Sequence, residues 1–285
     1  MWEIVQDALK DSLVMLPFLF ALYVLIELLE NNQSARRKTV RLLNGKYGAL
    51  IAGSVGVVPQ CGFSVMASDL YVRNYIKLGT LIAVFVATSD EALPLLITNA
   101  DTFVTGWIVL AVKFVYACIL GYVINFFDKK QLEEPTEDEH EKHLGCCHHE
   151  MNDEKRTVWG FLKHPVTHTV KIMIYIIVIN IIFGGLMYMY GDSIANFMMQ
   201  TEYLQPLVCS LVGLIPNCAS SVVITQLYSQ DIITMGALLA GLVTNSGIAL
   251  TVLFRKARKV GDALLIVGIM YVAGVVLGLL WTAVF

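Results

Sequence analysis

The chain has 285 residues, of which 56% are hydrophobic and 15% charged, and its mean hydropathy is +0.66. Soluble domains carry about 25% charged residues, so this composition excludes a soluble globular protein and indicates an integral membrane protein. The net charge of −3 indicates no particular partner, and we expect no nucleic acid among its partners. Six cysteines are scattered over apolar segments and one loop, so a disulfide framework is not expected.

Apolar segments long enough to cross a bilayer recur along the whole chain. In chain order they are residues 12–30, 48–72, 77–98 and 105–127, followed by 168–190, 205–229, 234–254 and 262–285. Each offers about the 20 residues that a helix needs to span the hydrocarbon layer. The sequence therefore predicts an all-α polytopic membrane protein, built from two sets of segments and a hydrophilic loop between them.

Two segments of the first set carry features that are unusual in a membrane helix. Residues 48–72 are interrupted by Pro59-Gln60-Cys61-Gly62. Because proline lacks a backbone N–H and disfavours helix at the preceding residue, a helical hairpin or a broken helix is expected there. Residues 77–98 have a polar centre, Thr88-Ser89-Asp90-Glu91, but are expected to cross the membrane.

One stretch of the chain occurs twice. Residues 55–65 read VGVVPQCGFSV and residues 212–222 read VGLIPNCASSV, a displacement of 157 positions (216 − 59). The same register continues without a gap from residue 53 to residue 97, and 17 of these 45 pairs are identical. Shared apolar composition raises such a count, but it does not align glycine, proline, cysteine and serine. We infer an internal duplication.

The basic loops predict how the chain is oriented in the membrane. Nearly all lysines and arginines fall on one side if residues 48–72 return to the side from which they came. Lys10 lies on the other side, and Lys113 lies within the bilayer. Since cytoplasmic loops carry the excess of Lys and Arg, the linker 129–164 is expected to be cytoplasmic. Both termini are then outside a bacterial inner membrane.

The two copies differ in the position of their basic loop. It follows the first helix in copy one (31–47) and precedes the last helix in copy two (255–261). Opposite orientation requires an odd number of crossings, so we predict three crossings plus one broken re-entrant helical hairpin in each copy. The expected domains are inverted repeat one (1–128), the linker (129–164) and inverted repeat two (165–285). Inverted repeats with discontinuous helices are typical of secondary transporters.

Polar groups at the breaks predict a binding site near the middle of the bilayer. Non-helical backbone at that depth persists only where protein buries it or where it lines a cavity. Half-helices ending there would present free N–H or C=O groups with their dipoles. The alternatives are that the prolines merely kink ordinary helices and that single Ser and Thr hydroxyls bond back to their own helix. The candidate substrate- or ion-binding residues are Gln60, Cys61, Ser64, Thr88, Ser89, Asp90, Glu91, Asn217, Cys218, Ser221, Thr244, Asn245 and Ser246.

Four of these residues are candidate metal ligands. An intramembrane carboxylate indicates function by default, so Asp90 and Glu91 would bind a cation or couple protons. Alternatively, one of them forms a structural ion pair with Lys113. Cys61 and Cys218 are related by the duplication, and two thiolates suit a soft metal or metalloid, whereas amide and carboxylate oxygens suit harder ions such as Mn²⁺. A buried cysteine can also be a small apolar filler.

The linker contains a second candidate metal site. Its histidines and cysteines, interleaved with acidic residues, are His140, His143, Cys146, Cys147, His148 and His149. The cysteines are adjacent rather than two to four residues apart, so this is compositional evidence and not a defined zinc motif. A flexible acidic linker with incidental histidines is the alternative.

The whole chain resembles a bacterial family of ten-transmembrane heavy-metal exporters, which are arsenic-efflux-like or manganese-transporter-like permeases. The resemblance lies in Gly56 to Ser64, Thr88 to Ala92, the His/Cys-rich loop before Lys163, Pro216-Asn217-Cys218 and Thr244 to Gly247. It implies metal or metalloid efflux. A count of ten helices differs from six crossings and two hairpins unless each broken segment counts as two.

These observations predict a secondary transporter rather than an enzyme. It would export manganese, another heavy metal or an arsenical by alternating access at a midplane site between the repeats. Its expected partners are the lipid bilayer and the ion, without a cofactor; proton coupling is a hypothesis, and homo-oligomers are left open. No nucleotide-binding loop is present in the sequence, which argues against an ATP-driven pump.

Two other functions fit the duplicated cysteines. One is a sulfur-oxyanion permease resembling thiosulfate permeases, with cysteine-tipped hairpins whose thiols would donate weak hydrogen bonds. Asp90 and Glu91 oppose it because they repel an anion unless they are protonated. The other is a membrane thiol oxidoreductase with Cys61 and Cys218 as its redox pair, which requires sulfurs close enough to bridge.

Overall fold

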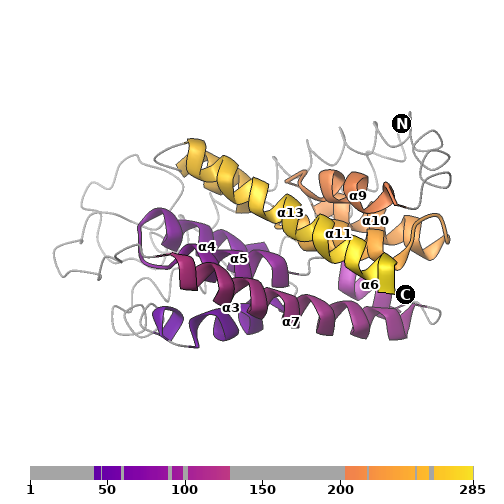
Figure 1. Cartoon of the computed structure of the whole chain (residues 1–285), viewed down its shortest axis with the longest axis horizontal. Coiled ribbons are helices and arrows are strands. Elements are labelled where there is room, and N and C mark those ends of the chain that lie inside the picture. The colour runs from indigo at the N-terminus through magenta and orange to yellow at the C-terminus, as the bar shows by residue number, and fades with distance from the viewer. Residues whose placement is uncertain are drawn as a thin grey trace, which may run out of the picture. The chain divides into compact units, whose positions relative to one another are not determined.

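A computed structural model describes residues 42–45, 47–58, 61–88, 92–98, 102–128, 203–216, 218–247, 249–256 and 260–284 (Figure 1). All regular structure in these ranges is helical, and they contain no strand. The chain divides into two compact units, of which one comprises Val40–Glu134 and Tyr190–Phe285 and holds every helix described below. The other unit, Met1–Thr39 with Pro135–Met189, lies outside the described residues, as do the predicted segments 12–30 and 168–190.

The ten helices labelled in the described part of the chain form two series with the same pattern of lengths. The first series is α3 (Gly48–Gly56), α4 (Cys61–Val72), α5 (Leu78–Ala87), α6 (Ala92–Thr98) and α7 (Phe103–Phe127). The second series is α9 (Gln205–Gly213), α10 (Cys218–Ser229), α11 (Met235–Thr244), α12 (Ala249–Lys256) and α13 (Val260–Val284). All starts and ends of the first series recur 157 positions later, except that α12 is one residue longer. Asn74 (φ 61°) and Asp231 (φ 58°), which share the same left-handed turn after α4 and α10, obey the same displacement. The duplication in the sequence is thus also present in the secondary structure.

The prolines break the helices where the sequence predicts. With 9 and 12 residues, α3 and α4 are about 14 and 18 Å long, too short to cross a hydrocarbon core of about 30 Å. Residues 48–72 therefore form two half-helices, as expected.

The structure also breaks a segment that was expected to cross as one helix. Residues 77–98 consist of α5 and α6, and Thr88 leaves the helical region with ψ 125°. In the second series Asn245 departs in the same way, with ψ 108°, and Gly247 follows in the left-handed region at φ 57°. In the described part of the chain, four stretches are long and apolar enough to span a membrane: Leu78–Thr98, Phe103–Phe127, Met235–Arg255 and Val260–Val284. Two of them, Leu78–Thr98 and Met235–Arg255, are interrupted in this way.

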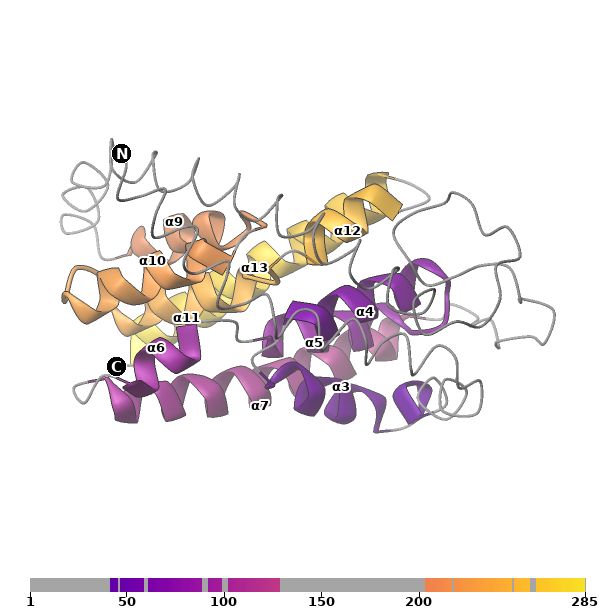
Figure 2. The same cartoon turned by 180° about the vertical axis from the view of Figure 1, so that it is seen from behind.

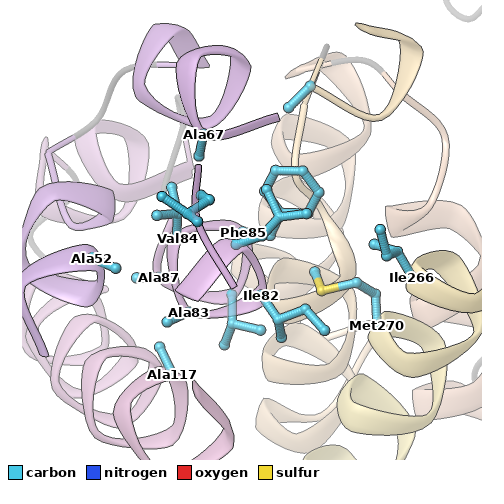
Figure 3. Close-up of a cluster of buried hydrophobic side chains, with 14 of the residues drawn as sticks. Ala52, Ala67, Ile82, Ala83, Val84, Phe85, Ala87, Ala117, Ile266 and Met270 are labelled. Carbon is cyan, nitrogen blue, oxygen red and sulfur yellow. The ribbon is translucent and has the colours of Figure 1, made fainter. Parts of the chain in front are cut away.

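The interrupted spans form the core, and the continuous spans cover it. Buried residues make up 80% of the α5–α6 window and 88% of the α11–α12 window, but 22% and 33% of α7 and α13. Figure 3 shows Ala52 of α3, Ala67 of α4 and Ala117 of α7 around α5, with Ile266 and Met270 of α13 on its other side. In a bilayer, α7 and α13 would therefore face lipid and shield the polar breaks.

Small residues allow the closest helix contacts. A Cβ at Gly79 of α5 would lie 2.4 Å from the Gly121 carbonyl oxygen of α7. The equivalent Gly236 of α11 would place a Cβ 2.6 Å from the Gly278 carbonyl oxygen of α13. Backbones that approach this closely are typical of helix packing in membranes, where small residues replace the hydrophobic driving force.

Across the two series, α4 packs against α12 and α10 packs against α6 (Figure 2). The half-helices of one copy thus contact those of the other. The second half of each interrupted span, α6 or α12, thus packs against a half-helix of the opposite copy.

Candidate functional site

Within each copy, the two breaks lie side by side. At the end of α3, a Cβ on Gly56 would lie 2.7 Å from the Val84 carbonyl oxygen and 2.8 Å from Ala87 Cβ, both in the last turn of α5. At the end of α9, a Cβ on Gly213 would lie 2.3 Å from Thr244 Oγ1, at the last residue of α11. These glycines bring the proline break and the polar break together, because any side chain would hold them apart.

A hydrogen bond joins the first copy to the polar break of the second. Ser68 Oγ of α4 donates to the Ala249 carbonyl oxygen, at the first residue of α12, at 3.2 Å, and also to the Ser64 carbonyl oxygen at 2.9 Å. Both serines are fully buried. Their equivalents, Ser221 and Thr225 of α10, are buried as well and bonded to each other in the same way, at 2.7 Å. Two of the predicted candidates, Ser64 and Ser221, therefore lie on the half-helices that contact the opposite copy.

The break between α11 and α12 is polar and closed to solvent. Asn245 Oδ1 accepts a hydrogen bond from the Gly247 N–H at 2.9 Å, which fixes the turn, and Asn245 is 3% exposed. Thr244 Oγ1 donates back to its own helix, to the Ala240 and Gly241 carbonyls. Ser246 Oγ is buried, and no hydrogen bond reaches it from the residues that the structure describes.

The strongest electrostatic feature of the site is Lys113, in the middle of α7. Its Nζ donates to the Thr88 carbonyl oxygen at 2.5 Å and to the Leu242 carbonyl oxygen at 2.7 Å. Lys113 is 1% exposed. Thr88 is the C-cap of α5 and Leu242 belongs to the last turn of α11. One ammonium thus contacts the C-terminal ends of both interrupted helices, where unpaired carbonyls and the negative end of the dipole attract a cation.

A comparison with known families identifies the chain. The sequence matches the model of the family described as "Putative, 10TM heavy-metal exporter" over residues 1–160 and 146–284. This chain belongs to that exporter family. The match confirms the resemblance expected from the duplicated motifs. No curated protein and no solved structure matches the chain.

Several residues predicted for the exporter site lie outside the described part of the structure. These are Gln60, Ser89, Asp90, Glu91 and Asn217, and in the linker His140, His143, Cys146, Cys147, His148 and His149. Among the described residues, no three His, Cys, Asp or Glu side chains form a group that could hold a metal ion. The roles of the undescribed candidates therefore stay predictions.

The two cysteines of the exporter motif occupy equivalent backbone positions. Cys61 is the first residue of α4 and Cys218 the first residue of α10, while their side chains lie outside the described part. The N-terminal end of a helix favours negative charge, and each of these positions begins such an end. The other described cysteines, Cys118 and Cys209, are free, and Cys209 packs within an apolar cluster of the core.

The bonds of Lys113 to two helix ends were not predicted from the sequence. The alternative that Lys113 pairs with Asp90 or Glu91 stays a prediction, because both carboxylates lie outside the described residues. The signal that could have indicated the two bonds is position, since an intramembrane lysine opposite two helix breaks has unpaired carbonyls within reach.

Proposed function

We propose that this protein is a secondary transporter that exports a metal or metalloid ion by alternating access. The ion would be manganese, another heavy metal or an arsenical, and it would bind where the helix breaks of both copies meet. The observation that carries this proposal is that membership of the exporter family coincides with a buried polar centre made of interrupted membrane helices. Irregular backbone at that depth is tolerated in membrane proteins where it is buried or lines a pathway.

The packing supports inverted repeats around this centre. Contacts between the copies are reciprocal, since α4 meets α12 and α10 meets α6, as a two-fold relation requires. Tyr116 Oη of α7 donates to the Ala273 carbonyl oxygen of α13 at 2.8 Å, and these positions are equivalent by the 157-residue displacement. Equivalent residues touch only near a symmetry axis. In Figure 1, α7 and α13 run in opposite directions, which supports an axis in the membrane plane and hence inverted copies.

In the proposed site, each residue class has a separate role. Cys61 and Cys218 supply thiolate ligands from the starts of two half-helices, and Gln60, Asn217 and Asn245 supply oxygen ligands. Asp90 and Glu91 bind the cation or carry the coupled proton. The re-entrant hairpins would be α3–α4 and α9–α10, whose half-helices are too short to span the membrane.

Outside the site, orientation follows the basic loops. The proposed location is the bacterial inner membrane, with both termini outside and the linker 129–164 in the cytoplasm. There the linker histidines and cysteines would capture an ion before export.

Transport in vesicles tests the proposal. Purified protein is reconstituted, and the movement of Mn²⁺, Zn²⁺, Cd²⁺, arsenite and thiosulfate is measured separately. We expect Cys61→Ser, Cys218→Ser and Asp90→Asn each to lower transport of one metal or metalloid at least tenfold, while the matched control Cys118→Ser keeps it. Cys118 is a suitable control because it lies on the continuous helix α7, beside the Gly53 position of α3, and belongs to neither break.

Three outcomes would contradict the proposal. Wild-type movement of thiosulfate alone would favour the sulfur-oxyanion permease, which the same helix starts could also serve by attracting an anion. A reversible disulfide between Cys61 and Cys218, without transport of any ion, would favour a thiol oxidoreductase. Unchanged transport in all three variants would show that the ion binds elsewhere.

A further inference from the structure

We propose that Lys113 is a resident cation that occupies the place of a coupling Na⁺, so that export by this protein does not require Na⁺. This inference rests on the proposed transport function for its effect on flux, but its structural part can be tested separately. The argument begins with the two carbonyls that Lys113 binds.

Both carbonyls belong to helix ends that converge from different copies. Thr88 caps α5 in the first copy and Leu242 lies in the last turn of α11 in the second. The last carbonyls of a helix have no partner within it, and their dipoles sum to a partial negative charge. Broken helices in secondary transporters use such ends, together with unwound carbonyls, to coordinate Na⁺ or a proton. Here the ligands of that kind of cation site are held by an amino group of the chain itself.

The two carbonyls are buried, and the Lys113 ammonium binds them at short distances. Lys113 is 1% exposed and Thr88 is 2% exposed, so water does not share the two carbonyls from an open surface. The Nζ contacts of 2.5 and 2.7 Å are as short as charge-assisted hydrogen bonds. A bilayer core offers no other donor to an exposed carbonyl. The ammonium therefore donates to a carbonyl at each of the two helix ends.

The position equivalent to Lys113 in the other copy holds an uncharged residue. Position 113 corresponds to Met270 by the 157-residue displacement, and Met270 is fully buried. Its side chain packs beside Ile82 of α5 (Figure 3). Methionine thus fits at the equivalent depth of the other copy. Lys113→Met is consequently the substitution that removes the cation with the least change in volume and shape.

The direct test is Na⁺-dependent stability of Lys113→Met. Thermal unfolding in detergent is followed in 150 mM NaCl and in 150 mM choline chloride, which have the same ionic strength. Wild-type protein and the control variant Met270→Leu should unfold at the same temperature in both salts. Lys113→Met should unfold earlier than wild type in choline and regain about 3 °C in NaCl, because Na⁺ binds the vacated carbonyls of the folded state only.

A second comparison separates the carbonyl site from a carboxylate partner. If Lys113 mainly neutralises Asp90 or Glu91, then adding Asp90→Asn and Glu91→Gln to Lys113→Met will abolish the gain in NaCl. If the carbonyls hold the ion, the gain will persist in the triple variant. Loss of the gain in the triple variant, or no gain in Lys113→Met itself, overturns the proposal.

Transport by the wild type gives a measurement that does not depend on how the variants fold. Metal export from vesicles should be equal within error when choline replaces all Na⁺, and a drop of twofold or more overturns the proposal. A wild-type protein that moves no metal at all refutes the proposed function. In that case the stability comparison still decides whether Lys113 occupies a cation site.

Discussion

The packing of α11 against α13 gives the sharpest prediction, because one glycine of α13 is tightly enclosed and another is not. A Cβ at Gly278 would lie 2.7 Å from Ala240 Cβ, 2.7 Å from the Gly236 carbonyl oxygen and 2.8 Å from Pro206 Cβ. None of these atoms is the end of a flexible side chain, so relief requires α11 and α13 to separate. Overpacking of this kind costs about 1–3 kcal/mol, and alanine regains about 1 kcal/mol in helix propensity. We expect Gly278→Ala to lose about 1 kcal/mol net, the middle of that cost less the gain in propensity.

The matched control is Gly268→Ala on the same helix, where a Cβ would meet nothing within 4 Å. It carries the same gain in propensity without the clash, so its stability should stay equal or rise by up to about 1 kcal/mol. In thermal unfolding of the purified protein, Gly278→Ala should melt roughly 3 °C below the wild type, and Gly268→Ala should not melt below it. Equal midpoints for the two variants would refute the contact between α11 and α13 from which the prediction is derived.

Two further contacts can be tested in the same assay. Tyr116→Phe removes the hydrogen bond to the Ala273 carbonyl between α7 and α13 and should cost about 0.6 kcal/mol, the average for such bonds in membranes; a cost near zero would argue against contact between the equivalent helices. Thr234→Ala removes the N-cap of α11, whose Oγ1 accepts from the Ala237 N–H at 3.3 Å, and should cost about 1 kcal/mol, whereas Thr234→Ser should restore most of it.

Much of the fold is readable from the sequence because its breaks have local chemical causes. In the interior of an apolar segment, Pro59 and Pro216 each favour a break, since neither can donate a backbone hydrogen bond there. The register of 157 residues then transfers every boundary from one copy to the other. The break after Thr88 is harder to foresee, because residues 77–98 are apolar enough to cross as one helix and no proline stands in the second copy at residues 245–248. There the chain is turned by the Asn245 side chain and by the left-handed Gly247.

The candidate site is less predictable than the fold because it depends on contacts between residues far apart in the sequence. The sequence pattern places Ser64 at the first break. It does not indicate that α4, the helix carrying Ser64, packs against the start of α12. The bonds of Lys113 to Thr88 and Leu242 link positions 25 and 129 residues away. Hydropathy marks Lys113 only as a charge in an apolar helix, whereas its partners follow from how α5 and α11 converge.

The two copies share their frame but divide their charges unequally, and this asymmetry constrains how the transporter can work. Asp90, Glu91 and Lys113 all belong to the first copy, where the second has Gly247, Ile248 and Met270. If the two copies were identical and swapped conformations during transport, the inward-open and outward-open states would present the same polar groups to opposite sides of the membrane. Because only one copy carries ionisable groups at these positions, the two end states differ in electrostatic energy. In the proposed transport cycle, side chains can therefore make the two end states unequal on a frame that is itself nearly two-fold.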